Sequence, residues 1–387
     1  MAFSSASNPQ MRLELKFKFM PLSFSWVAIH PQPKGVIQFI GGAFFGSFPT
    51  VFYHYFLKKL YEAGYTIIVL PFRFTFDHWS VALQLLREHY DLRLKLIEQV
   101  IDLGYNPEIY LQDANYRWVG HSLGCKYIML LELLSAFELT DSATSIQFSS
   151  LWTAIKPNLP QSNEAEIAKV ERQIEKFKGK VENIYSDWLI IKQKIAKLVG
   201  HDVNLTGLFL RNEASLLIAP DISDTDSAIP LRAVAKIIDR WGFGVKPNRH
   251  QTQILIQNSS LFSLTSIIAF GKDLIAGNLQ NSTGDSDVAW LAANLRPRLQ
   301  DKQLQELPHA YHLEPHGQQE DRYVVDFPGA IVVWITGLSF APLTPFSKAA
   351  RAFFNELKKP IIKTLEERKP LHDTAINLLT DVMQFKP

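Results

Sequence analysis

The chain has 387 residues, and its 40 lysine and arginine residues nearly balance 38 aspartate and glutamate residues, giving a formal net charge of +2 at pH 7. A chain of this length can bury one large α/β core that carries an insertion. So small a net charge excludes nucleic-acid binding through bulk electrostatics. The single cysteine, Cys125, excludes an internal disulfide and a Cys-x-x-Cys metal or redox site, and it is compatible with a reducing compartment.

The segment Met1–Gln10 is rich in serine but carries neither the continuous apolar stretch of a secretory signal nor the arginines of a transit peptide. We therefore expect a disordered start and a protein of the cytoplasm, or of the plastid interior if the source is plant-like, that is not secreted. A membrane-spanning helix needs about 18 consecutive apolar residues. The nearest approach, Ala330–Leu338, is far shorter, so we expect no transmembrane segment.

Strand and helix patterns alternate along the first third of the sequence. Apolar and charged residues alternate over 12–19, which predicts an antiparallel edge strand, and a second strand is expected at Phe24–Ile29. The short apolar segment Val36–Ile40 predicts a buried strand. The next expected elements are helices at Thr50–Ala63, Trp79–Leu103 and Cys125–Phe137, and strands at Tyr65–Leu70 and Tyr116–Val119. This alternation predicts a mostly parallel sheet flanked by helices.

Residues 138–212 interrupt the alternation with one long charged helix, expected over 163–199 and about 55 Å in length. Asn163 and Glu166 form a capping-box pattern at its start, and Gly200 is a stop signal at its end. Apolar residues recur along it at alternating spacings of three and four: Ile167, Val170, Ile174, Phe177, Val181, Ile184, Trp188, Ile191, Ile195 and Leu198. This heptad seam predicts either a lid or an oligomerisation arm. As an arm, the segment would bind a second copy of the chain or another protein.

After the insertion the sheet pattern resumes. The expected elements are strands at Ser215–Ala219, Leu264–Phe270 and Gln303–Leu307, and a helix at Leu231–Trp241. From Phe346 onward the pattern is helical, with breaks expected at Pro360 and Pro370. The predicted organisation is a core of 1–137 and 213–345, a helical insertion of 138–212 and a helical tail of 346–387.

The sequence Gly120-His121-Ser122-Leu123-Gly124 lies between a predicted strand and a predicted apolar helix. In that context Gly-x-Ser-x-Gly predicts a nucleophile elbow, a strained turn that exposes a serine above an α/β-hydrolase sheet. The two glycines let the turn pack closely against the strand and the helix. We therefore predict an α/β-hydrolase fold with Ser122 as its nucleophile; the alternative is an elbow whose serine lacks its partners.

An oxyanion hole needs two convergent backbone N–H donors, usually from the residue after the nucleophile and from the loop after the third strand. Leu123 is the first candidate. Gly41-Gly42-Ala43-Phe44 follows the strand Val36–Ile40, so the N–H of Ala43 or Phe44 is the second. The alternative is a glycine turn that only lets Phe44 and the next phenylalanine pack.

The acid of a serine triad is expected after a late strand, where Asp273 follows Phe270 by three residues. Rival acids follow the preceding strand: Asp221, Asp224 and Asp226. The base is expected after the last core strand, which favours His312, with His309 as the alternative. The chain order Ser122, Asp273, His312 is the order typical of this fold.

A third histidine in the same segment, His316, raises the question of a metal site. The spacing of His309, His312 and His316 matches no recognised ligand pattern, so we expect no metal. The sequence also carries no cofactor motif.

Between Val36 and Pro315, leaving out the insertion, the sequence resembles the α/β-hydrolase-like proteins of undefined function from photosynthetic bacteria and plastids. The segments that carry the resemblance are Gly41-Gly42-Ala43-Phe44 with Gly46, Thr75-Phe76-Asp77-His78, Gly120-His121-Ser122-Leu123-Gly124-Cys125-Lys126, Ala228-Ile229-Pro230-Leu231 and His312-Leu313-Glu314-Pro315. The resemblance implies the fold and the positions of the serine and the histidine, but no settled substrate. The long insertion, and His309 and Tyr311 beside the base, depart from the family pattern.

The leading functional hypothesis is a serine hydrolase of esterase or lipase-like type, in which His312 activates Ser122 and an acyl-enzyme forms. Phenylalanines beside the oxyanion loop, Phe44, Phe45 and Phe48, favour an apolar acyl group. The alternative is a non-catalytic or weakly catalytic scaffold that binds a partner through its insertion, because a fold does not determine a function. Convergence of the serine, acid and base distinguishes the two.

Overall fold

A computed structural model of the chain describes residues 16–43, 45–73, 75–135, 164–205, 210, 212–222, 246–257, 259, 261–326 and 362–381. Within the helix that begins at Glu164, the side chains of 164–177 are described only for Arg172 and Lys176. The expected helix at Leu231–Trp241, the apolar segment at Ala330–Leu338 and most of the expected tail lie outside the described residues.

The central sheet has eight strands: β1 (Met20–Leu22), β2 (Ser25–Ala28), β3 (Gly35–Ile40), β4 (Tyr65–Val69), β5 (Tyr116–His121), β6 (Ala214–Ile218), β7 (Thr265–Phe270) and β8 (Leu304–Leu307). Their order is β1-β2-β4-β3-β5-β6-β7-β8. β1 and β2 pair antiparallel, β2 lies antiparallel to β4, and the strands from β3 to β8 pair in parallel. The edge strand predicted over 12–19 is not found in its described part. The first strand begins at Met20, and residues 16–19 precede it.

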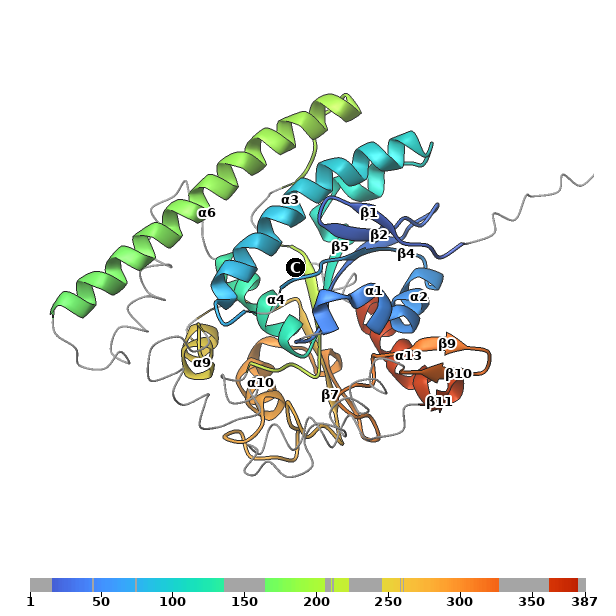
Figure 1. Cartoon of the computed structure of the whole chain (residues 1–387), viewed down its shortest axis with the longest axis vertical. Helices are drawn as coiled ribbons and strands as arrows, with labels where there is room; N and C mark the ends of the chain where they lie inside the picture. The colour runs from blue at the N-terminus through green and yellow to red at the C-terminus, as the bar shows by residue number, and fades with distance from the viewer. Residues whose placement is uncertain are drawn as a thin grey trace, which may run out of the picture.

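Alternate side chains of the buried strands enter two separate apolar cores, as the period of two requires. Val36 and Ile40 of β3 face one core, and Ile37 and Phe39 face the other. The first core is covered by α3 (His78–Asp102), α4 (Leu123–Leu134), α6 (Glu164–Val199), α9 (Arg249–Gln257) and α10 (Asp287–Leu295). The second is covered by α2 (His54–Glu62) and α13 (Leu365–Asp381), so helices flank both faces as predicted (Figure 1).

Two features outside the central sheet differ from the prediction. β9 (Gln318–Glu320), β10 (Tyr323–Val325) and β11 (Ile362–Thr364) form a small antiparallel sheet that the sequence pattern does not reveal. The expected break at Pro370 is wrong, because α13 continues through this residue and buries Leu371, Ala375 and Leu378 in the second core. Packing against the sheet thus outweighs the backbone hydrogen bond that the proline cannot donate.

The helix expected over 50–63 is divided into α1 (Pro49–Phe52) and α2, with the break at Tyr53. The break has a tertiary cause. Gly317 donates its N–H to the carbonyl oxygen of Phe52 at 2.8 Å, and its own carbonyl oxygen accepts the N–H of Tyr55 at 3.0 Å. The chain after β8 is therefore bonded on both sides of the break, and Tyr53 at the break is buried.

The apolar seam of α6 is buried within the same chain over 181–195. Val181, Ile184, Trp188, Ile191 and Ile195 belong to the first core. α6 runs alongside α3, where Trp188 stacks on Tyr90 with ring centroids 4.6 Å apart (Figure 1). The upstream seam residues Ile167, Val170, Ile174 and Phe177 lie outside the described side chains, and a lid or oligomerisation role for the segment stays a prediction.

A buried polar network ties α3 to the sheet below it. Arg93 of α3 forms ion pairs with Glu213, which precedes β6, and with Asp113 at 2.5 Å. Glu213 also accepts hydrogen bonds from Gln38 of β3 at 3.0 Å and from the Trp118 indole of β5 at 2.6 Å. Such charges are costly to bury unless they are paired, and this network pairs them while linking α3 to β3, β5 and the residue before β6.

Short 3₁₀ helices complete the described structure, at Phe45–Ser47, Glu108–Leu111, Asp113–Asn115, Arg296–Arg298 and Asp301–Gln303. Of the helices in the described ranges, none combines the length and the apolar character that crossing a bilayer demands.

Candidate active site

Ser122 occupies a strained turn between β5 and α4. Its backbone angles are φ 54° and ψ −123°, a conformation that L-residues rarely adopt. The glycines on either side make this turn possible. A Cβ at Gly120 would lie 2.9 Å from the backbone nitrogen of Cys125, and one at Gly124 would overlap the carbonyl oxygen of Ile40. The turn thus has the strained strand–turn–helix geometry of the predicted elbow, at the carboxyl end of β5.

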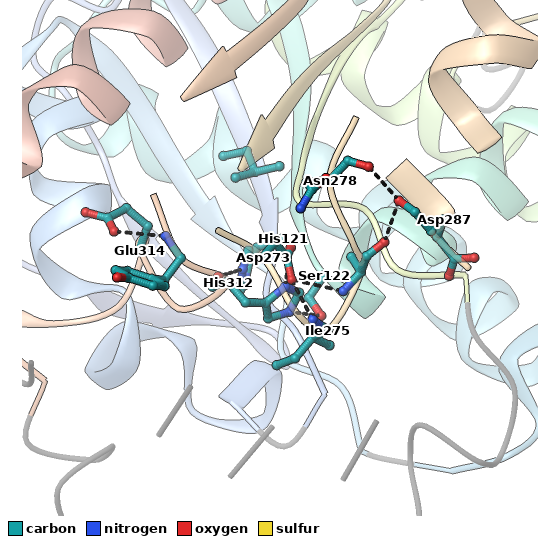
Figure 2. A network of polar contacts seen from close by, with 12 residues as sticks. His121, Ser122, Asp273, Ile275, Asn278, Asp287, His312 and Glu314 are labelled. Atoms are coloured by element: carbon teal, nitrogen blue, oxygen red, sulfur yellow. Dashed lines mark hydrogen bonds and ion pairs between the residues drawn. The ribbon is translucent and has the colours of Figure 1, made fainter. Parts of the chain in front are cut away.

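The structure brings the three predicted triad residues together (Figure 2). His312 Nε2 lies 2.8 Å from Ser122 Oγ, and His312 Nδ1 lies 2.8 Å from Asp273 Oδ2. All three side chains are buried. Because a carboxylate only accepts hydrogen bonds, His312 holds a proton on Nδ1, which leaves Nε2 free to accept the serine proton.

Asp273 is anchored by the loop that follows β7. Its second oxygen, Oδ1, accepts the N–H groups of Ile275 at 2.7 Å and Ala276 at 3.0 Å. The loops that carry Asp273 and His312 are also bonded to each other, because Lys272 donates its N–H to the carbonyl oxygen of Ala310 at 3.0 Å. The orientation of the carboxylate therefore comes from backbone groups that lie within a few residues of it.

Two of the alternative candidates, His309 and Asp221, lie within the described residues. His309 is exposed on the turn after β8, whereas His312 points inward. Asp221 donates its backbone N–H to the carbonyl oxygen of Ser122 at 3.3 Å, but the carboxylate that bonds His312 is that of Asp273. Asp224 lies outside the described residues.

Of the oxyanion-hole candidates, Leu123 is the first residue of α4, so its N–H has no acceptor within the helix. The loop after β3 runs close to Ser122, since a Cβ at Gly42 would lie 3.1 Å from the Cβ of Ser122. The N–H of Gly42 itself is bonded to the Tyr53 hydroxyl at 2.7 Å, which leaves Ala43 as the described candidate for the second donor. Phe44 lies outside the described residues.

Sequence reasoning missed two residues that border the triad. His121 Nε2 lies 2.7 Å from the backbone carbonyl oxygen of His312, and His121 Nδ1 lies 2.9 Å from the hydroxyl of Tyr53. Burial and the neighbouring His312 hold the pKa of His121 well below its usual range, and burial raises the pKa of Tyr53. The position of His121 inside the Gly-x-Ser-x-Gly sequence could have indicated a place near the serine. The place of Tyr53 could not have been predicted, because it depends on the break between α1 and α2.

His316 also approaches the site but does not join the triad. Its ring centroid lies 4.4 Å from that of Phe45 and 4.5 Å from that of Tyr53, inside an aromatic cluster. Burial and two neighbouring histidines hold its pKa well below the usual range. Across the described part of the chain, no three His, Cys, Asp or Glu side chains are grouped so that they could hold a metal ion.

The strand order, the antiparallel edge and the elbow after β5 define an α/β-hydrolase fold, confirming the predicted class. A family model described as "Protein of unknown function (DUF1350)" matches residues 18–171, which include the elbow and end before β6. A comparison with curated proteins finds no match. The predicted resemblance to proteins of photosynthetic bacteria and plastids stays a prediction.

A comparison with solved structures finds several matches that cover most of the chain at low identity. One is a thermophilic esterase, Est2, of the planctomycete Thermogutta terrifontis, with 10% identity, 83% of this chain and 91% of that chain covered and a TM-score of 0.36. A second is TT1662 of Thermus thermophilus, with 11% identity, 78% and 92% covered and a TM-score of 0.34. A third is esterase B of Lactobacillus rhamnosis, with 14% identity, 74% and 72% covered and a TM-score of 0.33.

Proposed function

We propose that the protein is a serine hydrolase of the esterase or lipase-like type that forms an acyl-enzyme on Ser122. The observation that carries the proposal is the pair of 2.8 Å contacts made by His312, one to Ser122 Oγ and one to Asp273. An orphaned elbow serine would have no such partners. Convergence of nucleophile, base and acid from three separate loops is what favours an enzyme over a partner-binding scaffold.

In the proposed reaction, Ser122 Oγ attacks the carbonyl carbon of an ester while His312 Nε2 takes the hydroxyl proton. Asp273 stabilises the imidazolium that forms. The N–H of Leu123, with that of Ala43 or Phe44, would stabilise the negative charge on the carbonyl oxygen. His312 then gives its proton to the leaving alcohol as the carbon–oxygen bond breaks. A water molecule hydrolyses the acyl-enzyme by the same steps and releases a carboxylic acid.

We favour an apolar acyl group as the substrate class. Phe48 follows the oxyanion loop and is 66% exposed, and Leu274 follows Asp273 and is 52% exposed. Both therefore lie at the carboxyl edge of the sheet, the same edge as Ser122, with apolar surface available for contact. Phe45, by contrast, is buried against Phe52 with ring centroids 4.8 Å apart, so it serves the core.

The test is covalent labelling of the purified protein with a fluorophosphonate probe, which reacts with activated serines. We expect labelling of the wild type and none of Ser122→Ala, with His312→Ala reduced by several orders of magnitude. His309→Ala is the matched control, because that histidine is a neighbour in sequence but exposed. A folded wild type that takes no label would contradict the proposal and favour the scaffold, while loss of labelling in His309→Ala alone would reassign the base.

A further inference from the structure

A continuous series of hydrogen bonds joins the oxyanion loop, the elbow and the base loop beneath the triad. The N–H of Gly42 lies 2.7 Å from the hydroxyl of Tyr53, which lies 2.9 Å from Nδ1 of His121. Nε2 of His121 lies 2.7 Å from the backbone carbonyl oxygen of His312. Two side chains thus connect three segments that each supply a group to the site.

The direction of every bond in this series follows from its two ends. A backbone N–H only donates and a backbone carbonyl oxygen only accepts. The Tyr53 hydroxyl therefore accepts from Gly42 and uses its single proton toward His121 Nδ1. His121 must then hold its own proton on Nε2 and donate it to His312. A neutral His121 with its proton on Nε2 therefore makes every bond of the series with a donor and an acceptor.

Packing leaves these two side chains little freedom to move. Both are buried, and the Tyr53 ring lies between that of Phe39, at a centroid distance of 4.8 Å, and that of His316, at 4.5 Å. The His121 ring lies 5.0 Å from that of His312. A neutral His121 adds no positive charge beside the imidazolium that the proposed reaction forms on His312, so it can support the base without opposing its charge.

We propose that Tyr53 and His121 are positioning residues: they fix the positions of the Gly42–Ala43 backbone and of His312 relative to Ser122. The inference rests on the proposed serine hydrolase function and deepens it. Neither side chain is assigned a contact with substrate. Removing the Tyr53 hydroxyl leaves the Gly42 N–H without its acceptor and His121 Nδ1 without its donor. Both the oxyanion loop and the base loop then lose a hydrogen bond that restricts their position.

The experiment compares the wild type with Tyr53→Phe, His121→Gln and His121→Ala, using the same fluorophosphonate probe. Two quantities are measured: the second-order rate constant of labelling and the final fraction of protein labelled. Tyr110→Phe is the matched control, since its buried hydroxyl bonds Thr66 at 2.8 Å near the start of β4, at the sheet edge opposite to Ser122. That control is expected to label at the wild-type rate.

We expect Tyr53→Phe and His121→Ala to label roughly ten- to a hundred-fold more slowly, with the final labelled fraction unchanged. His121→Gln is expected to recover part of the rate, because a glutamine Nε2 can still donate to the carbonyl oxygen of His312. A purely structural role would instead lower the labelled fraction and leave the rate of the remaining molecules unchanged.

The outcomes separate this inference from the proposed function. If the wild type labels through Ser122 and both Tyr53→Phe and His121→Ala label at its rate, the positioning role is refuted and the serine hydrolase stands. If the folded wild type takes no label, both proposals fall. Slower labelling of Tyr53→Phe and His121→Ala at full extent, with partial recovery in His121→Gln, supports the positioning role.

Discussion

Asp273 Oδ2 lies 2.8 Å from Nδ1 of His312, although 39 residues separate the two in the chain. The contact depends on the parallel pairing of β7 with β8, which places the loops after the two strands side by side. The other carboxylate oxygen is occupied by the N–H groups of Ile275 and Ala276. These two bonds fix the direction of the carboxylate, and in the proposed mechanism a carboxylate held in this way orients the imidazole of His312.

Substituting Asp273→Asn should abolish most of the activity while preserving the fold. The amide oxygen can still accept from Ile275 and Ala276, so the amide nitrogen must face His312 and force its proton onto Nε2. That tautomer cannot accept the Ser122 proton, and we expect kcat to fall by about 10⁴-fold. Hydrolysis of a short-chain p-nitrophenyl ester measures the loss, and thermal unfolding checks the fold.

The control for this substitution is Asp285→Asn, an exposed aspartate whose carboxylate accepts from the Ser282 hydroxyl at 3.0 Å. We expect its kcat to match that of the wild type. Activity of Asp273→Asn within ten-fold of the wild type would mean that another group orients the base.

Adding one methyl group at Gly124 should destabilise the elbow. A Cβ there would overlap the carbonyl oxygen of Ile40, and backbone atoms cannot move aside as a flexible side chain can. We expect Gly124→Ala to lower the free energy of unfolding by roughly 3 kcal/mol. Gly179→Ala is the matched control, since among the described residues no atom outside the local backbone of α6 lies within 4 Å of a Cβ added there.

Gly179→Ala is expected to stabilise the protein by about 0.5–1 kcal/mol, because alanine is the better helix former. Urea unfolding measures both variants. Equal stability of the two would show that the close packing of the elbow on β3 is not maintained in solution.

Truncation of Trp188 tests whether α6 is part of the core in solution. Trp188 is buried against Tyr90, and the Arg93 guanidinium lies 5.8 Å from its ring centroid. We expect Trp188→Ala to cost about 3–5 kcal/mol of unfolding free energy. Leu198→Ala on the same helix, 41% exposed, should change it by less than about 1 kcal/mol. A small effect at Trp188 would indicate that α6 separates from α3 and projects as an arm.

The buried His372 should make stability depend on pH. Burial and the nearby charges of Arg368 and Lys59 lower the pKa of His372 to about 3, so it stays neutral in the folded protein. In the unfolded chain its pKa returns to about 6.5, and the unfolded state therefore binds an extra proton between those values. The contribution of neutral His372 to the free energy of unfolding is therefore complete above pH 6.5 and is lost progressively as the pH falls toward 3. At pH 5 the loss amounts to about 2 kcal/mol.

The measurement is the free energy of unfolding of the wild type and of His372→Phe at pH 7.5 and pH 5. The phenylalanine keeps an aromatic ring beside Tyr55, whose centroid lies 4.9 Å from that of His372. Other buried groups titrate equally in both proteins and cancel in the difference. We expect the variant to gain about 2 kcal/mol relative to the wild type on acidification, and an unchanged difference would disprove the assignment.

Much of the fold could be predicted from local patterns. Periodicity and turn residues place β3, β4 and β5 within one or two residues of their observed bounds, and the two glycines around Ser122 indicate the elbow. Such features depend on residues a few positions apart, whose side chains take fixed relative directions on a strand or a helix. The break at Tyr53 could not be predicted in this way, because its cause is a pair of bonds to Gly317.

The sequence by itself determined the class of fold, the elbow serine and a short set of candidate acids and bases. Only the tertiary structure decided which of them meet, burying His312 and exposing His309 although they are only three positions apart. It also placed Tyr53 and His121 beneath the triad. The physical reason is that periodicity specifies which face a side chain occupies, whereas contacts between distant loops arise from strand pairing and core packing, which no local pattern encodes.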